Sequence, residues 1–475
     1  MKRLLRLDVI IVVFILASMI QYAQVAYLLT ASGQAALWSV ESDLLMSSGV
    51  TRYAKDVLLL IFSIGWVAAL PRVPLRAWQT RLVRRYSVWL VIVMCLGMVP
   101  FLLGYSPLFF LPYGLRWIML LHASFGLFIL YSALSSNRHD RSNLFWLLLM
   151  VLAVNTVFVL LQTRHWSTFL GFAIGSSRLT GVFGQAGIAG FFAMGVALLA
   201  WLAPDLGWKR RVLIAGWCLF LALSSGTRFA ALAIILLIAA VFWELLGRIK
   251  PRLRRAIKFI FLPLAVCLLF VSYQAIIEQV NRGDAITQQF QSGGRASTFV
   301  ETVRMLSEGH MGELLIGRGL GVGTNTAVGQ VLASGTPPSL YRFNILVDNS
   351  LLTAFFQFGL LGSIVFWFGW VAFVVSIGTR LSGQTRQQFV LLVFLMAVAL
   401  FVGNLFEQYF LMIAFAVSLG RLSHASIRTR STTTALELLG RGQKAAPAEV
   451  AWAVNEVAWT SQDGRTGSRG FDGAG

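Results

Sequence analysis

The sequence predicts an all-α polytopic membrane protein with about 12 transmembrane helices. Of its 475 residues, 57% are hydrophobic and only 12% are charged, and the mean hydropathy is +0.75. Soluble domains carry about 25% charged residues, so a soluble chain of this length could not bury so much apolar surface. Apolar stretches long enough to cross a ~30 Å hydrocarbon core recur along the chain and are closed by basic clusters.

Each apolar stretch defines one predicted span. The first has no small-residue cleavage site behind it, which indicates a retained span rather than a removed signal peptide. The seventh and twelfth are short, and the seventh is required because the basic segment after it would otherwise lie outside. The predicted spans are 8–29, 57–71, 87–104, 116–134, 143–162, 181–203, 211–225, 229–246, 259–275, 350–378, 388–405 and 408–420.

Basic residues predict the orientation of these spans. With the N-terminus inside, the cytoplasmic segments collect 28 of the 39 lysine and arginine residues, including clusters at 72–85, 209–211 and 248–258. This asymmetry follows the positive-inside rule, so we expect both termini in the cytoplasm. The net charge of +20 then reflects orientation and contact with membrane lipids, and no nucleic acid partner is expected.

The chain divides into a transmembrane domain, residues 1–421, and a polar tail, residues 422–475, that is expected to be disordered in the cytoplasm. The remaining cytoplasmic loops are too short for a nucleotide-binding domain, which needs on the order of 100 residues. The glycine-rich run 317–323 has the wrong spacing for a nucleotide-binding motif. Any chemistry therefore requires a substrate that is already activated. No disulfide or metal-ligand pattern is available from the cysteines, which all fall inside predicted spans: Cys95, Cys218 and Cys267.

A long loop, residues 275–349, is predicted on the non-cytoplasmic side between spans nine and ten. Loops of more than about 15 residues in a compact protein are usually functional or disordered. Ser297 can cap a helix in this loop. Apolar residues recur on that helix at helical spacing, which predicts an amphipathic helix at the membrane surface: Phe299, Val303 and Leu306.

Arginines on the predicted outer side are candidate phosphate ligands. Arg228 ends a tight turn between two spans, at the mouth of the bundle, where a charge usually has a partner. Arg178 and Arg295 flank the same region if the loops fold back over it. A guanidinium binds phosphate oxygens bidentately, so converging arginines would suit a pyrophosphate. Exposure to solvent or contact with lipid headgroups is the ordinary alternative for each of them.

Asp348 lies where the long loop meets the tenth span, beside Asn349. It is either a helix cap or a general base whose partial burial tunes its proton affinity. His165 and His310 are alternative bases, although each is more simply an ordinary loop histidine.

The order of several short motifs resembles the O-antigen ligase and O-antigen polymerase family of membrane glycosyltransferases. The resemblance covers roughly residues 145–410. Each motif is degenerate alone, but their order and membrane placement together are fairly specific. The matching runs are 181–189, 225–228, 294–295, 316–321, 348–350 and 359–362.

The resemblance implies a bacterial inner-membrane enzyme with its active site facing the periplasm. Its donor would be an undecaprenyl-pyrophosphate-linked glycan, and it would need neither a nucleotide nor a metal or other cofactor. Arg228 and Arg295 would hold the pyrophosphate leaving group, and Asp348 would activate the acceptor hydroxyl. Substrate-binding residues would include Arg178, Arg318, Asn349 and His165.

Ligases of this family typically carry His-Asn where this chain has Asp348-Asn349. That difference favours a polymerase of O-antigen or exopolysaccharide repeats, with an O-antigen ligase acting on lipid A core as the alternative. A chain-length-regulating partner stays open. A transporter or flippase is the alternative from another class, but charged residues in the predicted spans lie at their ends rather than near the midplane.

Overall fold

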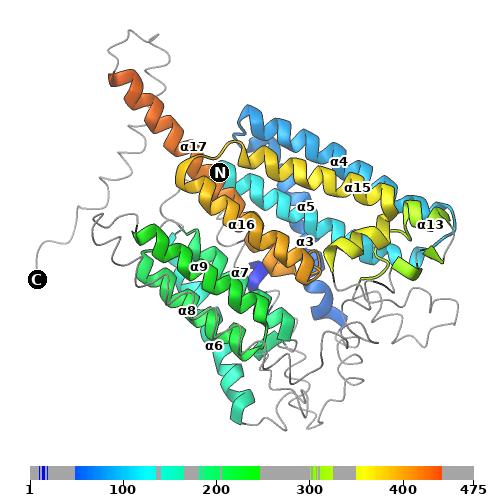
Figure 1. Ribbon diagram of the computed structural model, residues 1–475, viewed down its shortest axis with the longest axis horizontal. Coiled ribbons are helices and arrows are strands. Elements are labelled where there is room, and N and C mark those ends of the chain that lie inside the picture. Colours follow the sequence, from blue (N-terminus) through cyan, green and yellow to red (C-terminus); the bar gives the residue numbers. More distant parts are fainter. Residues whose placement is uncertain are drawn as a thin grey trace, which may run out of the picture.

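The computed structural model describes residues 49–134, 141–164, 181–183, 186–203, 206–246, 311–324 and 349–440, with isolated residues among 10–19 and 300–308. Within this part of the chain the secondary structure is helical and contains no strand, as predicted (Figure 1). In chain order the elements are α3 (Gly49–Ala69), η1 (Leu70–Arg72), α4 (Ala77–Leu102), η2 (Leu108–Phe110), α5 (Leu111–Leu134), α6 (Arg141–Arg164), η4 (Gly181–Phe183), α7 (Ala186–Trp201), α8 (Trp208–Ser224), α9 (Arg228–Leu246), α13 (Met311–Ile316), α15 (Ser350–Gly378), α16 (Gly383–Val402) and α17 (Tyr409–Gly440).

Among the described helices, five are long and apolar enough to cross a membrane. They are Ala77–Leu102, Leu108–Leu134, Arg228–Leu245, Ser350–Gly378 and Gly383–Val402. The described part of the chain is therefore all-α, with several candidate membrane-spanning helices.

Ten of the twelve predicted spans coincide with described helices, from α3 to α9 and from α15 to α17. The ninth predicted span, 259–275, lies outside the described residues, and only isolated helical residues of the first are described. The full number of membrane crossings, the side on which each loop lies and the positions of the termini stay predictions.

The predicted start of the disordered tail, residue 422, falls inside a helix. α17 continues to Gly440 without a break. Its extension still packs on the bundle, since the Ser426 hydroxyl donates to the Arg380 carbonyl at 3.2 Å and His424 Nδ1 lies 3.2 Å from the Ser132 carbonyl oxygen. A helix that is already formed lengthens at little cost, and no proline or glycine stands between residue 422 and Gly440. The rest of the predicted tail, 441–475, lies outside the described residues.

The buried centre of the bundle is formed by α5, α7 and α17. Most of α5 is buried, and α7 is buried on all sides from Ala189 onward. Glycine and alanine make this close packing possible: a Cβ on Gly195 would lie 2.8 Å from the Phe410 ring, and one on Gly420 would lie 2.6 Å from Tyr131 Cβ. Small residues of this kind let helix backbones approach closely in membranes. In Figure 1, α4 and α15 lie side by side on one flank of the bundle, and α8 and α9 on the other.

One end of the bundle, here called the basic end, gathers the helix termini that carry the predicted cytoplasmic clusters. Arg211 at the start of α8 pairs with Glu244 near the end of α9 at 3.5 Å, and Gln388 at the start of α16 donates to the same carboxylate at 2.5 Å. Arg380 after α15 lies over the Trp78 ring at the start of α4, 5.2 Å from its centroid.

The opposite end, here called the loop end, gathers the helix termini that border the candidate site segments. Asp56 in α3 pairs with Arg116 in α5 at 2.8 Å, and the Asn349 side chain donates to the Phe401 carbonyl near the end of α16 at 2.7 Å. α13 also lies at this end, away from the projecting end of α17 (Figure 1). The described helix termini therefore form two separate sets, one at each end of the bundle.

Candidate functional site

A break in α15 shapes the loop end. Gly359 has φ +64° and ψ −166°, so two helical halves meet there at a kink. A break at this point frees the carbonyls of Phe356 and Gln357 from their helical partners. Those carbonyls accept hydrogen bonds from the backbone N–H groups of Arg318 and Gly319, both at 2.9 Å. The kink thus forms a docking point for the glycine-rich run.

The run 317–324 is inserted between α4, α5 and α15. Leu320 is fully buried, its N–H donates to the Gly97 carbonyl at 3.1 Å, and a Cβ on Gly114 would lie 2.4 Å from the Leu320 side chain. Glycines at alternate positions take positive φ angles, which other residues adopt only with strain. Because several N–H groups of this run bind backbone carbonyls, it is a packing element rather than a phosphate cradle. This agrees with the exclusion of a nucleotide-binding motif from its spacing.

Arg318, a predicted substrate ligand, is buried within this insertion. Its Nε donates to the Glu313 carboxylate at 2.8 Å, and its side chain is only 5% exposed. One terminal nitrogen donates to the Met305 carbonyl at 2.7 Å, and the guanidinium lies 5.0 Å from the centroid of the Phe356 ring. These contacts tie the glycine-rich run, α13 and α15 together, which favours a structural role for this arginine.

Asn349, another predicted substrate ligand, caps α15. Its side-chain oxygen accepts from the N–H groups of Leu351 and Leu352 at 2.8 and 3.3 Å. Its amide nitrogen donates to the Phe401 carbonyl. The capping role considered for Asp348 is therefore filled by its neighbour, because Asn349 satisfies the first free N–H groups of the helix.

A polar stripe begins at this cap. Ser350, Thr353 and Gln357 recur at helical spacing on α15, and all three are fully buried. Ser350 donates to the Gly403 carbonyl at 3.1 Å, and Asn404 donates to the Thr353 hydroxyl at 3.1 Å. The stripe therefore faces the connection between α16 and α17.

Gln357 and Asn404 keep unsatisfied polar atoms among the described residues. Both side-chain amide atoms of Gln357 and the oxygen of Asn404 are buried without a described hydrogen-bond partner. A buried polar group left unpaired costs about 1–3 kcal/mol. A buried polar atom without a partner calls for an explanation such as an ordered water or a bound polar ligand, so this stripe is a candidate binding surface.

An ion pair lies at the same end of the bundle. Asp56 and Arg116 are 2.8 Å apart, with side-chain exposures of 16% and 24%. Tyr409, at the start of α17, is close enough to interact electrostatically with both charges. Its hydroxyl is buried and has no described hydrogen-bond partner. The Asp56–Arg116 pair therefore places two charges at the loop end, where the polar stripe begins.

Arg228 begins α9, directly after the tight turn predicted from the sequence. Gly226 has φ +66°, and the Ser225 hydroxyl donates to the Thr227 hydroxyl at 2.9 Å. Arg228 is exposed. Phe229, the next residue, has its ring 6.1 Å from that of Phe191, which in turn lies next to Gly403. The Gly403 carbonyl accepts a hydrogen bond from the hydroxyl of Ser350 at the start of α15, so these contacts run from the residue after Arg228 to that helix start.

The other predicted site residues lie outside the described residues: Asp348, Arg295, Arg178 and His165. The helical residues 303–305 and 307 fall within the predicted amphipathic helix of the long loop, and Arg304 and Glu308 pair there at 3.4 Å.

Sequence reasoning missed the polar stripe and the Asp56–Arg116 pair. The signal for the pair was present, since opposite charges stand at the outer ends of two predicted spans. The stripe left a weaker signal, because serine, threonine and glutamine interrupt an apolar span without a charge.

No model of a known protein family matches this chain, and no curated protein matches it either. Membership of the O-antigen ligase and polymerase family is therefore still the prediction made from its motifs.

Proposed function

We propose that this protein polymerises oligosaccharide repeat units carried on undecaprenyl pyrophosphate, at the periplasmic face of a bacterial inner membrane. The observation that carries the proposal is the gathering of polar and charged groups at the loop end. Arg228, the Asp56–Arg116 pair and the polar stripe of α15 lie at that end. The described basic residues from the clusters that the sequence predicts to be cytoplasmic lie at the opposite end.

The proposed reaction uses few groups. The acceptor hydroxyl attacks the anomeric carbon of the donor sugar, a new glycosidic bond forms, and the bond from that carbon to the pyrophosphate oxygen breaks. Asp348 takes the proton of the acceptor hydroxyl, while Arg228 and Arg295 stabilise the charge that develops on the departing lipid pyrophosphate. The donor is already activated, so the step needs no nucleotide.

The polar stripe would bind sugar hydroxyls. Gln357 offers amide donors and an acceptor, and the unpaired oxygen of Asn404 offers a further acceptor. The stripe is uncharged, which supports glycan binding over the charged midplane site of an ion-coupled transporter.

The purified protein in liposomes with an undecaprenyl-pyrophosphate-linked repeat unit tests this proposal. We expect longer glycans on the lipid carrier, detected by gel electrophoresis and mass spectrometry. Movement of the lipid across the bilayer without new linkages would instead indicate a flippase. Transfer only to added lipid A core would indicate a ligase.

Asp348→Asn should abolish elongation because an amide of the same shape cannot accept the proton. Asp284→Asn, in the same loop, is the matched control and should elongate normally. Protein level and membrane insertion should be unchanged in both variants. Glycans of normal length made by the Asp348→Asn protein would refute the assignment of the base.

A further inference from the structure

A cavity lies away from the candidate site, between α4, α5, α15, α16 and α17. Its volume is about 150 Å³, and its lining is mostly aromatic and aliphatic. An apolar cavity of about this size holds a group as large as benzene. It can therefore accept a segment of an acyl chain but not a whole lipid.

The cavity reaches the lipid-facing side of the bundle. Ala372 and Arg85 line it and are exposed. Neighbouring apolar side chains on the same two helices are also exposed, including Val375 at 54% and Val88 at 56%. In a bilayer these apolar surfaces would contact lipid tails, so an acyl chain could enter the cavity directly from the surrounding lipid.

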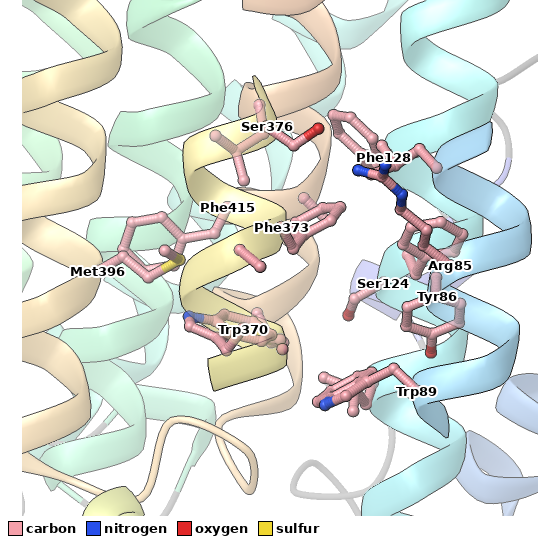
Figure 2. Close-up of a pocket in the computed structure, with 18 residues that line it drawn as sticks. Arg85, Tyr86, Trp89, Ser124, Phe128, Trp370, Phe373, Ser376, Met396 and Phe415 are labelled. Carbon is pink, nitrogen blue, oxygen red and sulfur yellow. The ribbon is translucent and has the colours of Figure 1, made fainter. Parts of the chain in front are cut away.

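A cation stands at one end of the cavity. Figure 2 shows Arg85 and Ser376 toward one end, and Trp89 and Trp370 toward the other. The Arg85 end is the one nearer the basic end of the bundle, since Arg380 follows Ser376 by four residues. No described carboxylate forms an ion pair with Arg85. The guanidinium of Arg85 can form charge-assisted hydrogen bonds with a phosphate, so it favours an anionic ligand over a neutral one.

Two buried hydroxyl groups within the lining are also unsatisfied among the described residues. They are the Tyr86 hydroxyl, on the residue after Arg85, and the Ser124 hydroxyl on α5. Both can donate to an ester carbonyl oxygen of a lipid. The cavity thus offers a cation, hydroxyl donors and apolar walls to one amphipathic molecule.

Aromatic side chains separate this cavity from the loop end. Trp370 lies 5.7 Å from Phe406, and Phe406 lies 4.7 Å from Trp117, measured between ring centroids. A lipid in the cavity would therefore lie apart from the polar stripe. Its headgroup would face the basic end, whereas the proposed donor pyrophosphate would lie at the loop end.

We propose that this cavity is a binding site for an anionic phospholipid, whose acyl chain enters between α4 and α15 and whose phosphate binds Arg85. The site would take lipid from the leaflet that contacts the basic end. This inference rests on the described helices and does not depend on the proposed polymerase activity.

Native mass spectrometry of the full-length protein in mild detergent tests the site, with dioleoyl phosphatidylglycerol and dioleoyl phosphatidylcholine as probes. We expect tighter binding of phosphatidylglycerol, and about ten-fold weaker binding of it after Arg85→Gln, because a charge-assisted hydrogen bond is lost. Ala372→Phe should weaken binding of both lipids by filling the mouth of the cavity. Ala372 is exposed, so this change should leave the fold intact.

Arg84→Gln is the matched control, since Arg84 is exposed on the same helix but does not line the cavity. It should bind phosphatidylglycerol as the wild type does. Equal losses for Arg84→Gln and Arg85→Gln would indicate general attraction to a basic surface and overturn the proposal. Unchanged binding in the Arg85→Gln or Ala372→Phe protein would overturn it as well.

Discussion

Two arginines near the loop end differ in what surrounds them. Arg318 is buried, and Glu313, the Met305 carbonyl and the Phe356 ring satisfy its guanidinium. Arg228 is exposed at the start of a helix beside a tight turn. Burial of a paired charge points to structure, whereas an exposed guanidinium at a helix start can reach an anionic ligand.

The two arginines should therefore respond differently to lysine, which keeps the charge but lacks the planar fork. Arg228→Lys should lower the rate of glycan elongation at least about ten-fold, equivalent to about 1.4 kcal/mol of transition-state stabilisation. Its thermal stability in detergent should not change. The rate is measured with the liposome assay, and Arg295→Lys should behave in the same way.

Arg318→Lys is the contrasting variant. An ammonium cannot reach the Glu313 carboxylate and the Met305 carbonyl with the same geometry, so the protein should lose about 1–3 kcal/mol of stability. The melting temperature reports this loss. Normal elongation by both the Arg228→Lys and Arg295→Lys proteins would contradict pyrophosphate recognition by these side chains.

At the scale of elements, the kink in α15 and the glycine-rich run fit each other at backbone contact. A Cβ on Gly359 would lie 2.4 Å from the Gly317 backbone nitrogen, and a Cβ on Gly317 would lie 2.4 Å from the Gly359 nitrogen. Neither position has space for a side chain, and both have positive φ angles. This pair of glycines holds the first half of α15, and with it the polar stripe, at an angle to the second half.

Gly359→Ala should therefore be strongly destabilising. The alanine would occupy a backbone conformation that costs about 1–3 kcal/mol for a residue with a side chain, and its Cβ would also collide with backbone atoms. Gly216→Ala in α8 is the matched control, because no atom lies within 4 Å of the added Cβ. It should be neutral or slightly stabilising, as alanine favours helices. Equal melting temperatures for the two variants would show that the contact between α15 and the run is not tight.

At the scale of the whole molecule, charge separates the two ends of the bundle. The basic end carries arginine and lysine at the starts of α4, α8 and α16, and after α15. The loop end carries the described candidate site. A membrane potential and anionic lipids favour basic segments on the cytoplasmic side, so the arrangement predicts one orientation of the entire bundle.

Single cysteines introduced into a protein lacking Cys95, Cys218 and Cys267 test this orientation. Leu108→Cys at the loop end should react with a membrane-impermeant maleimide in intact spheroplasts. Arg386→Cys at the basic end should react only after the membrane is opened. Both positions are exposed, so burial does not limit their labelling. The reverse pattern would invert the predicted topology and place the candidate site in the cytoplasm.

The sequence by itself determined the helical class and most helix positions. Long apolar stretches in this chain can satisfy their backbone hydrogen bonds only as helices if they lie in a membrane, so length and hydropathy are sufficient signals. It also predicted the tight turn before Arg228, because glycine readily adopts the positive φ angle that such a turn requires. Gly226 has such an angle in the structure. α17 runs past the predicted boundary at residue 422, because contacts with Arg380 and Ser132, far away in the chain, hold its extension.

Only the tertiary structure decided the roles of individual polar residues. Arg318 and Asn349 look like ligands in the sequence, yet one is paired with Glu313 and the other caps α15. Gln357 interrupts an apolar span without any clear pattern, yet it is buried with unsatisfied amide atoms. Whether a polar side chain is already paired depends on neighbours that are distant in the chain, and no local spacing encodes them.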